Sequence, residues 1–283
     1  GNTAIGYQAG LQHETGNRNT VIGYQAMYDT AENSAPASND NVFIGYRCGG
    51  GEWESAASED NVAIGNYAMD GGTDGDGMNG CNSNTVVGHN AGTNLTQGDS
   101  NVIIGNTAAE ALTTGSENIC VGFAANVASA DNTNNIVIGD HLTASDKDNA
   151  VFIGNNTNHI HLDFNADNTW DYTSDIRQKT DIKEDSLGLL FINDLRPVTY
   201  KHKSPSEFPK EWTAYNPNDK KPMGGDKTIH GLIAQEVKEA LDKQNIDTFA
   251  GWSVGDDGRQ RISAEKMVFP LIKAVQELSQ QIE

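Results

Sequence analysis

The stretch NVIIGNTAAEALTTGSE, residues 101–117, is one unit of a repeat that runs through the first half of the sequence. Each unit opens with asparagine, a short apolar run and glycine. These openings are NTAIG at 2–6, NTVIG at 19–23, NVFIG at 41–45, NVAIG at 61–65, NTVVG at 84–88, NVIIG at 101–105, NICVG at 118–122 and NIVIG at 135–139, with a degenerate AVFIG at 150–154. Successive asparagines lie 17, 22, 20, 23, 17, 17 and 17 residues apart, so a 17-residue unit carries three consecutive insertions. Self-similarity of this kind is typical of repeat architectures.

Each unit offers one short strand rich in β-branched residues, a glycine where the chain turns, and a polar connection that ends in Asn or Asp. Such a strand is too short to be stable alone. Stacked coils let the Val and Ile rows form a continuous apolar ladder, with Asn repeating at each corner where left-handed or side-chain-capped geometry is needed. The sequence therefore predicts a mainly β solenoid or β-roll over residues 1–157.

The composition of the chain changes near residue 173. Residues 1–173 hold 23 of the 30 glycines but only 3 of the 19 Lys and Arg, against 21 of the 39 Asp and Glu, so they carry a net charge of −18 and the remainder carries −2. An acidic surface repels phosphate, which argues against nucleic acid as a partner.

Cysteine usage and hydropathy exclude further classes of protein. Three cysteines without metal-binding spacing, Cys48, Cys81 and Cys120, predict neither a disulfide framework nor a zinc site, and they fit assembly in a reducing cytoplasm. No apolar run approaches the length of a membrane span, so membrane insertion is not expected.

The insertions at 29–40, 49–60 and 69–83 leave neighbouring coils at equivalent positions, so we expect them to form one patch on one edge. Trp53 lies among acidic residues of the second insertion. We expect its indole to be exposed and suited to stacking on a sugar ring, which makes it the candidate receptor contact. The Asp-rich stretch at 70–80 lacks the spacing of an EF-hand loop and is expected to be a flexible acidic loop.

The segment HIHLDF, residues 159–164, alternates with a period of two. This places Ile160 and Leu162 on one face of a strand and His159 and His161 on the other. Histidines from three chains that met on a common axis could hold a transition metal. The pattern favours an apolar face turned inward and histidines turned outward, so no metal site is predicted.

The stretch TSDIRQKTDI, residues 173–182, places Ser174 five residues before Lys179. Neither a strand nor a helix brings side chains at that separation together, so only a turn over residues 175–178 could do so. Burial favours the neutral form of a lysine, which could then take the proton of a serine hydroxyl. The serine oxygen would attack the carbonyl of Thr173, a substrate already held in the same chain.

Two resemblances to known families follow from these motifs. The NxxIG blocks resemble those of bacteriophage tail-fibre shafts and, more loosely, the β-roll heads of trimeric autotransporter adhesins, which implies a parallel homotrimer. Four later blocks resemble the self-cleaving intramolecular chaperone domain found at the C-terminus of phage tail fibres, tailspikes and endosialidases. They are TSDIRQKTDI at 173–182, LRPVTYKHK at 195–203, HGLIAQEVKEAL at 230–241 and LIKAVQEL at 271–278.

The second resemblance implies a self-cleaving serine peptidase that needs no cofactor, with Ser174 as nucleophile, Lys179 as general base and Thr173–Ser174 as the scissile bond. It also implies a strand connector over 158–173 and a smaller α+β chaperone domain over 174–283. A lone histidine before glycine, His230, is expected to be a buried structural residue.

Apolar residues near the end of the sequence repeat at intervals of three and four, which is the pattern of a coiled-coil seam, and Pro270 marks the helix start. The seam positions are Val268, Leu271, Val275, Leu278 and Ile282. Two heptads do not fix the number of helices. The homotrimer is therefore an implication of the resemblance.

Together these features predict a host-attachment segment of a phage tail fibre, assembled in the host cytoplasm and carried on the virion. The expected partners are two further copies of the chain, other tail proteins and a host cell-surface glycan or protein receptor. The main alternative is a trimeric bacterial adhesin head with a structural, non-cleaving C-terminal domain. A membrane-tethered transcription factor is disfavoured by the acidic charge, and a glycan hydrolase by the lack of a recognisable carboxylate pair.

Overall fold

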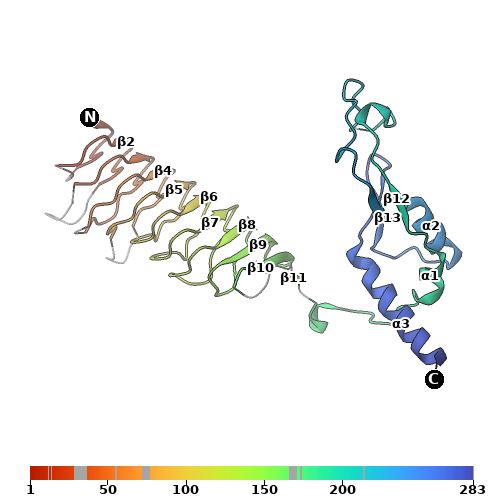
Figure 1. The fold of residues 1–283 in the computed structure, drawn as a ribbon. Coiled ribbons are helices and arrows are strands. Elements are labelled where there is room, and N and C mark those ends of the chain that lie inside the picture. The colour runs from red at the N-terminus through yellow and green to blue at the C-terminus, as the bar shows by residue number, and fades with distance from the viewer. Residues whose placement is uncertain are drawn as a thin grey trace. The chain divides into compact units, whose positions relative to one another are not determined.

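The computed structural model describes residues 1–282 except 12, 14, 29–36, 55, 72–76, 166–170, 173 and 213. Contacts divide the chain into two compact units, Gly1–Gln178 and Lys179–Glu283. Each unit is considered by itself (Figure 1). Among the residues described, no helix combines the length and apolarity needed to cross a membrane.

The first unit is a β-solenoid of about eight turns, as the repeat predicted. One short strand from each coil joins a single 11-stranded sheet in chain order, and the coils stack along the axis in Figure 1. The strands are β1 (Thr3–Ile5), β2 (Thr20–Ile22), β3 (Val42–Ile44), β4 (Val62–Ile64), β5 (Thr85–Val87), β6 (Val102–Ile104), β7 (Ile119–Val121), β8 (Ile136–Asp140), β9 (Ala150–Asn155), β10 (His159–Asp163) and β11 (Asp171–Tyr172). Strands β1 to β9 pair in parallel, whereas β10 and β11 fold back antiparallel.

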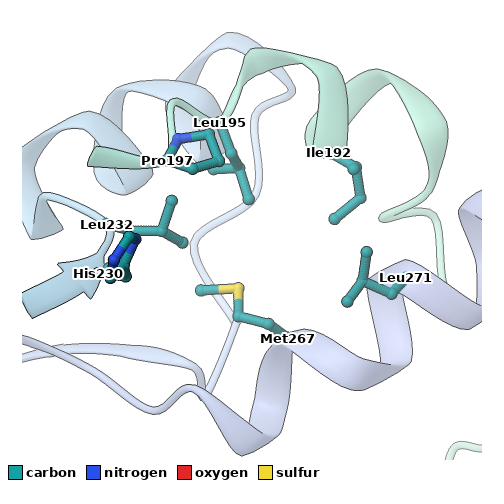
Figure 2. Close-up of a pocket in the computed structure, with 8 residues that line it drawn as sticks. Ile192, Leu195, Pro197, His230, Leu232, Met267 and Leu271 are labelled. Atoms are coloured by element: carbon teal, nitrogen blue, oxygen red, sulfur yellow. The ribbon is translucent and has the colours of Figure 1, made fainter. Parts of the chain in front are cut away.

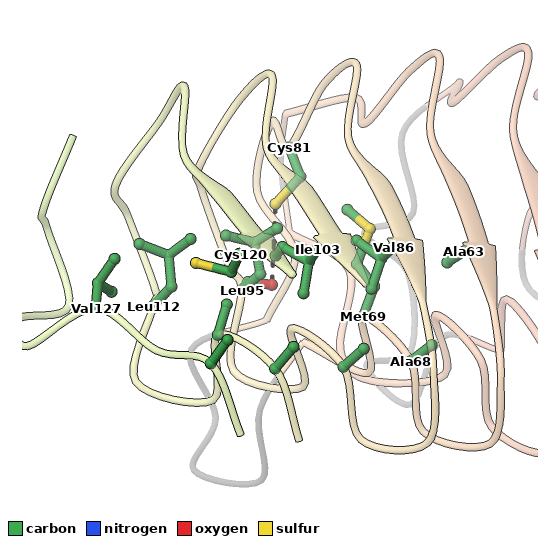
Figure 3. Packing of buried hydrophobic residues seen from close by; sticks show 14 of the residues in the cluster. Ala63, Ala68, Met69, Cys81, Val86, Leu95, Ile103, Leu112, Cys120 and Val127 are labelled. Carbon is green, nitrogen blue, oxygen red and sulfur yellow. Dashed lines mark hydrogen bonds between the residues drawn. The ribbon is translucent and has the colours of Figure 1, made fainter. Parts of the chain in front are cut away.

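The core of the solenoid is built from the middle residue of each strand. Equivalent positions stack in register, as Ile103 does on Cys120, so the apolar ladder runs without a break (Figure 3). The fully buried middle residues of β3 to β8 are Phe43, Ala63, Val86, Ile103, Cys120 and Val137. The predicted apolar ladder is confirmed for the row formed by the second residue of each strand. The flanking residues of β2 to β7 point away from the core and stay partly exposed.

From Asn19 to Asn118, the asparagine that opens each unit is buried and bonds to the asparagines of both neighbouring coils. Asn101 donates its backbone N–H to Asn84 Oδ1 at 2.9 Å, and its own Oδ1 accepts the backbone N–H of Asn118 at 2.9 Å. Its Nδ2 donates to Asn84 Oδ1 at 3.0 Å and to the carbonyl of Gly115 at 3.1 Å. Each carboxamide therefore satisfies buried backbone groups that no water reaches.

Two further backbone requirements explain the rest of the motif. The left-handed residue at each corner is the one before the asparagine, such as Glu117 with a φ of 62°, while the asparagine caps through its side chain. The glycine that follows the strand also has a positive φ, +139° at Gly105. A Cβ there would lie 2.1 Å from the carbonyl oxygen of Gly122, so only glycine lets the coils approach.

Asp70, at the start of the third insertion, is a carboxylate that loses its water on burial and gains only weak polar contacts in return. Its side chain is 5% exposed, and its Oδ1 lies 3.8 Å from Arg47 Nε. Within the described residues, this oxygen accepts no hydrogen bond. Desolvation by burial raises the pKa of Asp70 to about 6, opposed by the charge of Arg47 and by a hydrogen bond from the backbone of Gly50.

The second unit is a small α+β fold that ends in a helix, as predicted. Its elements are α1 (Leu189–Asp194), β12 (Val198–Tyr200), η2 (Pro205–Glu207), β13 (Ile229–Gly231), α2 (Ala234–Lys243), β14 (Trp252–Val254), β15 (Gln260–Ile262), η3 (Glu265–Met267) and α3 (Val268–Ile282). Strands β12 and β13 form one antiparallel pair, and β14 and β15 form another. The core contains Leu187, Phe191, Val237, Leu241 and Met267.

Helix α3 is fastened to the start of α1 by a side-chain cap. The carboxylate of Glu277 accepts the backbone N–H of Leu189 at 2.7 Å. Pro270 lies in the first turn of α3, where its missing N–H costs no hydrogen bond, and it is buried with Ala274. A neighbouring side of α3 carries the apolar side chains that the heptad pattern singled out.

We predict that Asn101→Ala lowers the free energy of unfolding of the solenoid by about 4 kcal/mol, because it leaves the N–H of Asn118 and the carbonyl of Gly115 buried and unpaired. The measurement is chemical denaturation followed by the β-sheet circular dichroism signal. Asn106→Ala, an exposed asparagine of the same coil, is the control and should change stability by less than about 0.5 kcal/mol. Equal effects of the two substitutions would contradict the ladder's role.

We predict that Asp70→Asn stabilises the solenoid at neutral pH by on the order of 2 kcal/mol. The folded-state pKa of about 6 exceeds the ordinary aspartate pKa of 3.8, so the folded state binds this proton more tightly than the unfolded chain does. Wild-type stability should therefore rise as pH falls through about 6 towards 4, and this part of the slope should vanish in the variant. Denaturation series across this pH range test it, with exposed Asp60→Asn as the control that keeps the wild-type slope.

Candidate functional site

A one-turn 3-10 helix, η1 (Ile176–Gln178), lies between the serine and the lysine that the sequence singles out. The backbone N–H of Gln178 donates to the carbonyl of Asp175 at 3.1 Å, which closes the turn. The side chain of Asp175 accepts the backbone N–H of Arg177 at 2.8 Å and pairs with its guanidinium at 2.6 and 2.9 Å. A turn is therefore present over residues 175–178, where the sequence requires one if Ser174 and Lys179 are to meet, and the approach of these two side chains stays a prediction.

The residues on either side of this turn lie in different units. Ser174 belongs to the first unit, Lys179 opens the second, and both are exposed. Thr173, the other half of the predicted scissile bond, lies outside the described residues. The roles of Ser174 and Lys179 remain predictions from the sequence and its resemblance.

The segment after Lys179 runs without regular secondary structure to α1. Its charged side chains reach α3, since Lys273 Nζ lies 3.8 Å from Glu184 Oε2. Asp181 has a φ of 51°, a left-handed conformation that aspartate tolerates better than most residues and that bends the chain at this point. The next residue, Ile182, is 63% exposed.

Trp53 is buried rather than exposed, which corrects its assignment as a receptor contact. Its ring packs edge-to-face against His13 at 4.5 Å and Phe43 at 5.9 Å, and Nε1 donates to the carbonyl of Gly49 at 3.1 Å. The second and third insertions pair through a parallel bridge between Trp53 and Met78. This additional bridge widens the core. The indole has a lower free energy buried there than exposed to water, because its large apolar surface is removed from solvent.

The histidines of β10 face the core side of the sheet, which corrects the expected arrangement of an inward apolar face. His161 pairs with Phe152 of β9 and stacks on its ring at 5.9 Å with an interplanar angle of 13°. Ile160 points the other way, beside Ile153, and is 41% exposed. Because β10 folds back antiparallel on β9, its register rather than its hydrophobicity decides which face turns inward. Among the described residues, no three His, Cys, Asp or Glu side chains gather closely enough to hold a metal ion.

The three cysteines are unsuited to nucleophilic chemistry. Cys48, Cys81 and Cys120 are fully buried in the solenoid core. Desolvation by burial raises the pKa of each thiol to about 12, so none is a thiolate at neutral pH.

A cavity of about 500 Å³ opens in the second unit between α1, β13 and α3 (Figure 2). Its walls are apolar, with Ile192 and Leu195 facing Met267 and Leu271. His230 also lines it and is exposed, although the sequence predicted a buried residue. The correction follows from β13, whose only strand partner among the described residues is β12, so that one face of the pair stays open.

Two apolar surfaces are exposed, of which the sequence analysis anticipated only the second. The outward rows, the first and third positions of β1 to β8, contain only Thr, Val and Ile, and Ile104 is 41% exposed. Beside them Tyr7, Tyr24 and Tyr46 stack at 5.2 and 5.3 Å. A signal was present in the sequence, since strands that are apolar at every position are typical of sheets covered on both faces.

The second surface is the predicted seam of α3. All its members lie between 43 and 86% exposed in the single chain, which makes an almost continuous apolar stripe: Val268, Leu271, Val275, Leu278 and Ile282. Phe269 and Ile272 beside the stripe are about half exposed as well, at 48 and 50%.

Comparison with known proteins identifies part of the chain. Residues 174–245 match a peptidase family described as the chaperone of endosialidase. No curated protein and no solved structure matches the chain. The matched segment begins at Ser174, includes the whole of η1 and Lys179, and runs through α2. Behind its β-solenoid, the chain thus carries a domain of the endosialidase-chaperone family, a C-terminal intramolecular chaperone of a kind linked to self-cleaving peptidase activity.

Proposed function

We propose that this chain is a host-attachment segment of a bacteriophage tail fibre that forms a homotrimer and trims itself. The second unit directs the association of three chains and then releases itself by cleavage between Thr173 and Ser174. Ser174 is the nucleophile and Lys179 the general base. The observation that carries the proposal is the family match, which begins at Ser174 and contains Lys179.

The chemistry needs only residues of the chain. The neutral amine of Lys179 takes the hydroxyl proton of Ser174 while Oγ bonds to the carbonyl carbon of Thr173. The peptide C–N bond then breaks, and the leaving amine of Ser174 takes the proton back from the lysine. Water hydrolyses the resulting ester, leaving a carboxylate on Thr173 and restoring the serine hydroxyl. Because the reacting groups belong to one chain, proximity supplies much of the rate.

The surface of the solenoid supports association with further copies. Rods that carry a charge of −18 each repel one another over most of their surface. The outward rows hold no charged residue, so they offer an uncharged stripe along which such rods can approach. A second copy repeats the same rows at the same spacing, which makes the stripe self-complementary. The exposed rows are proposed to form the trimer interface of the shaft.

The exposed seam of α3 supports association in the second unit. A helix that turns its apolar seam to water gains free energy when other helices cover it. With the seam on one face, three α3 helices form a bundle that holds the three chains together before the solenoid forms. Three-residue strands gain little until their neighbours are in place, so such a template shortens the search for a common register.

The remaining partners follow from the same proposal. The fibre binds a host cell-surface glycan or protein receptor and joins other tail proteins on the virion, after assembly in the host cytoplasm. With the Trp53 indole buried, the receptor contact is not assigned to this residue. Nucleic acid and membrane insertion play no part in the proposal.

We predict that purified wild-type protein gives two fragments on a denaturing gel, and that Ser174→Ala leaves the chain whole. Lys179→Met should slow cleavage by about 100-fold or more, because the general base is removed. Ser186→Ala, an exposed serine of the same segment, is the control and should cleave like wild type. N-terminal sequencing of the smaller fragment should begin Ser-Asp-Ile.

Sedimentation of the uncut Ser174→Ala variant should show a trimer. Cleavage of wild type should slow on dilution, because assembly precedes it. A wild-type trimer that stays whole would contradict self-trimming and favour the adhesin head with a structural C-terminal domain. Cleavage by monomers at an unchanged rate would contradict its dependence on assembly.

A further inference from the structure

The apolar cavity of the second unit is continuous with the exposed seam of α3. Leu271 belongs to both, since it lines the cavity and is 46% exposed as a member of the seam (Figure 2). The facing wall is formed by Ile192 and Leu195 at the end of α1 and by Leu232 after β13. Among the described residues that line the cavity, His230 has the only polar side chain. The group that fits such a cavity is uncharged and apolar.

Phe269 presents a group of this kind on the other flank of the same helix. Its ring is 48% exposed, and with Ile272 it lines a groove beside Glu184. Phe269 and Leu271 are two residues apart, which places their side chains about 160° from each other around α3, with the seam residue Val268 between them. One helix therefore carries an exposed aromatic ring on one flank and an apolar cavity on the other. A chain cannot fill its own cavity with this ring.

The symmetry of the proposed trimer brings these two features together. A threefold rotation keeps every residue at the same height along its axis, so helices that pack along their seams are parallel and in register. Each helix then meets a different neighbour on each flank. Phe269 lies midway in sequence between Met267 and Leu271, which line the cavity from η3 and α3. The ring of one copy therefore meets the next copy at the level of its cavity.

The size and chemistry of the cavity suit a phenyl ring. Its volume is about 500 Å³, whereas a cavity of roughly 150 Å³ lined by aliphatic side chains already holds benzene. Met267 adds a flexible thioether, which packs favourably against aromatic rings. A ring seated there takes both its own exposed surface and the walls of the cavity out of water.

We propose that the ring of Phe269 inserts into the cavity of the next copy, so that three identical contacts encircle the α3 bundle. The inference rests on the proposed homotrimer and deepens it, because it names the side chain and the cavity that join the copies. The contact is heterologous, since the surface that a copy offers differs from the one it receives. One partner cannot touch two flanks about 160° apart, so a pair of chains leaves one ring and one cavity unfilled, and a closed ring of three fills them all.

The first test is sedimentation of the uncut Ser174→Ala chain with a second substitution. Phe269→Ala should raise the chain concentration at which half of the material is trimeric by about 100-fold, because three buried rings are lost at once. Phe269→Leu keeps a smaller apolar group and should raise it by about tenfold. Met223→Ala, which trims a 52% exposed apolar residue that lines neither the cavity nor the groove, is the matched control and should change it by less than about twofold.

The second test locates the ring in the assembled full chain. Phe269 is replaced by photoreactive benzoyl-phenylalanine, which keeps the aromatic ring and links to neighbouring C–H bonds on irradiation. Dimer and trimer bands should appear on a denaturing gel, and peptide mapping should place the link on Leu195, Leu232 or Met267. The same replacement of Met223 should give no such bands.

The two measurements leave the inference open to contradiction from either side. A folded Phe269→Ala chain that forms trimers at the same concentration as the control overturns it, and so does a link from position 269 to position 269 of a neighbour. If Phe269→Ala does not fold, the site of the link decides. A link to the cavity supports the inference, and a link to any other surface overturns it.

Ser174→Ala by itself distinguishes the two proposals. If this variant sediments as a monomer, the proposed homotrimer fails and this inference fails with it. If it sediments as a trimer and the position-269 link lies outside the cavity, the homotrimer stands and only the role of Phe269 is lost.

Discussion

The buried asparagine carboxamide is the interaction on which the first unit depends. Each one accepts a backbone N–H from the next coil and donates to carbonyls that water cannot reach, as Asn101 does between Asn84 and Asn118. A coil therefore has satisfied polar groups only when its neighbour is already in place. The same dependence holds for its strand, which has three residues and no partner within the coil. A solenoid built in this way is stable once complete and slow to begin, which is the problem that an intramolecular chaperone solves.

Charge and hydrophobicity are separated on the solenoid in a way that restricts how it can associate. Almost all of the net charge of −20 belongs to residues 1–173, whereas the outward rows of the sheet have none. The middle row is committed to the core, so the rows on either side of it are available for another chain. The exposed stripe on α3 repeats the arrangement in the second unit. Both units thus offer apolar surface along one side, and in our proposal the helix bundle forms first and sets the register of the shaft.

The proposed reaction depends on whether water reaches the lysine amine. A lysine beside a serine is a useful base only when it is neutral, and an amine in water is charged. A turn such as η1 does not by itself remove water from an amine.

The sequence by itself determined the repeat, the strand in each coil, the change of composition near residue 173 and the apolar seam of α3. These features depend on local rules, namely periodicity, glycine and turn chemistry, which neighbours in the chain already encode. Only the tertiary structure decided that Trp53 enters the core, that the histidines of β10 turn towards Phe152, and that Asp70 is buried with a raised pKa. Each of these depends on pairing between coils or strands distant in sequence, because burial is set by what stacks on a residue in space and not by the residues beside it in the chain.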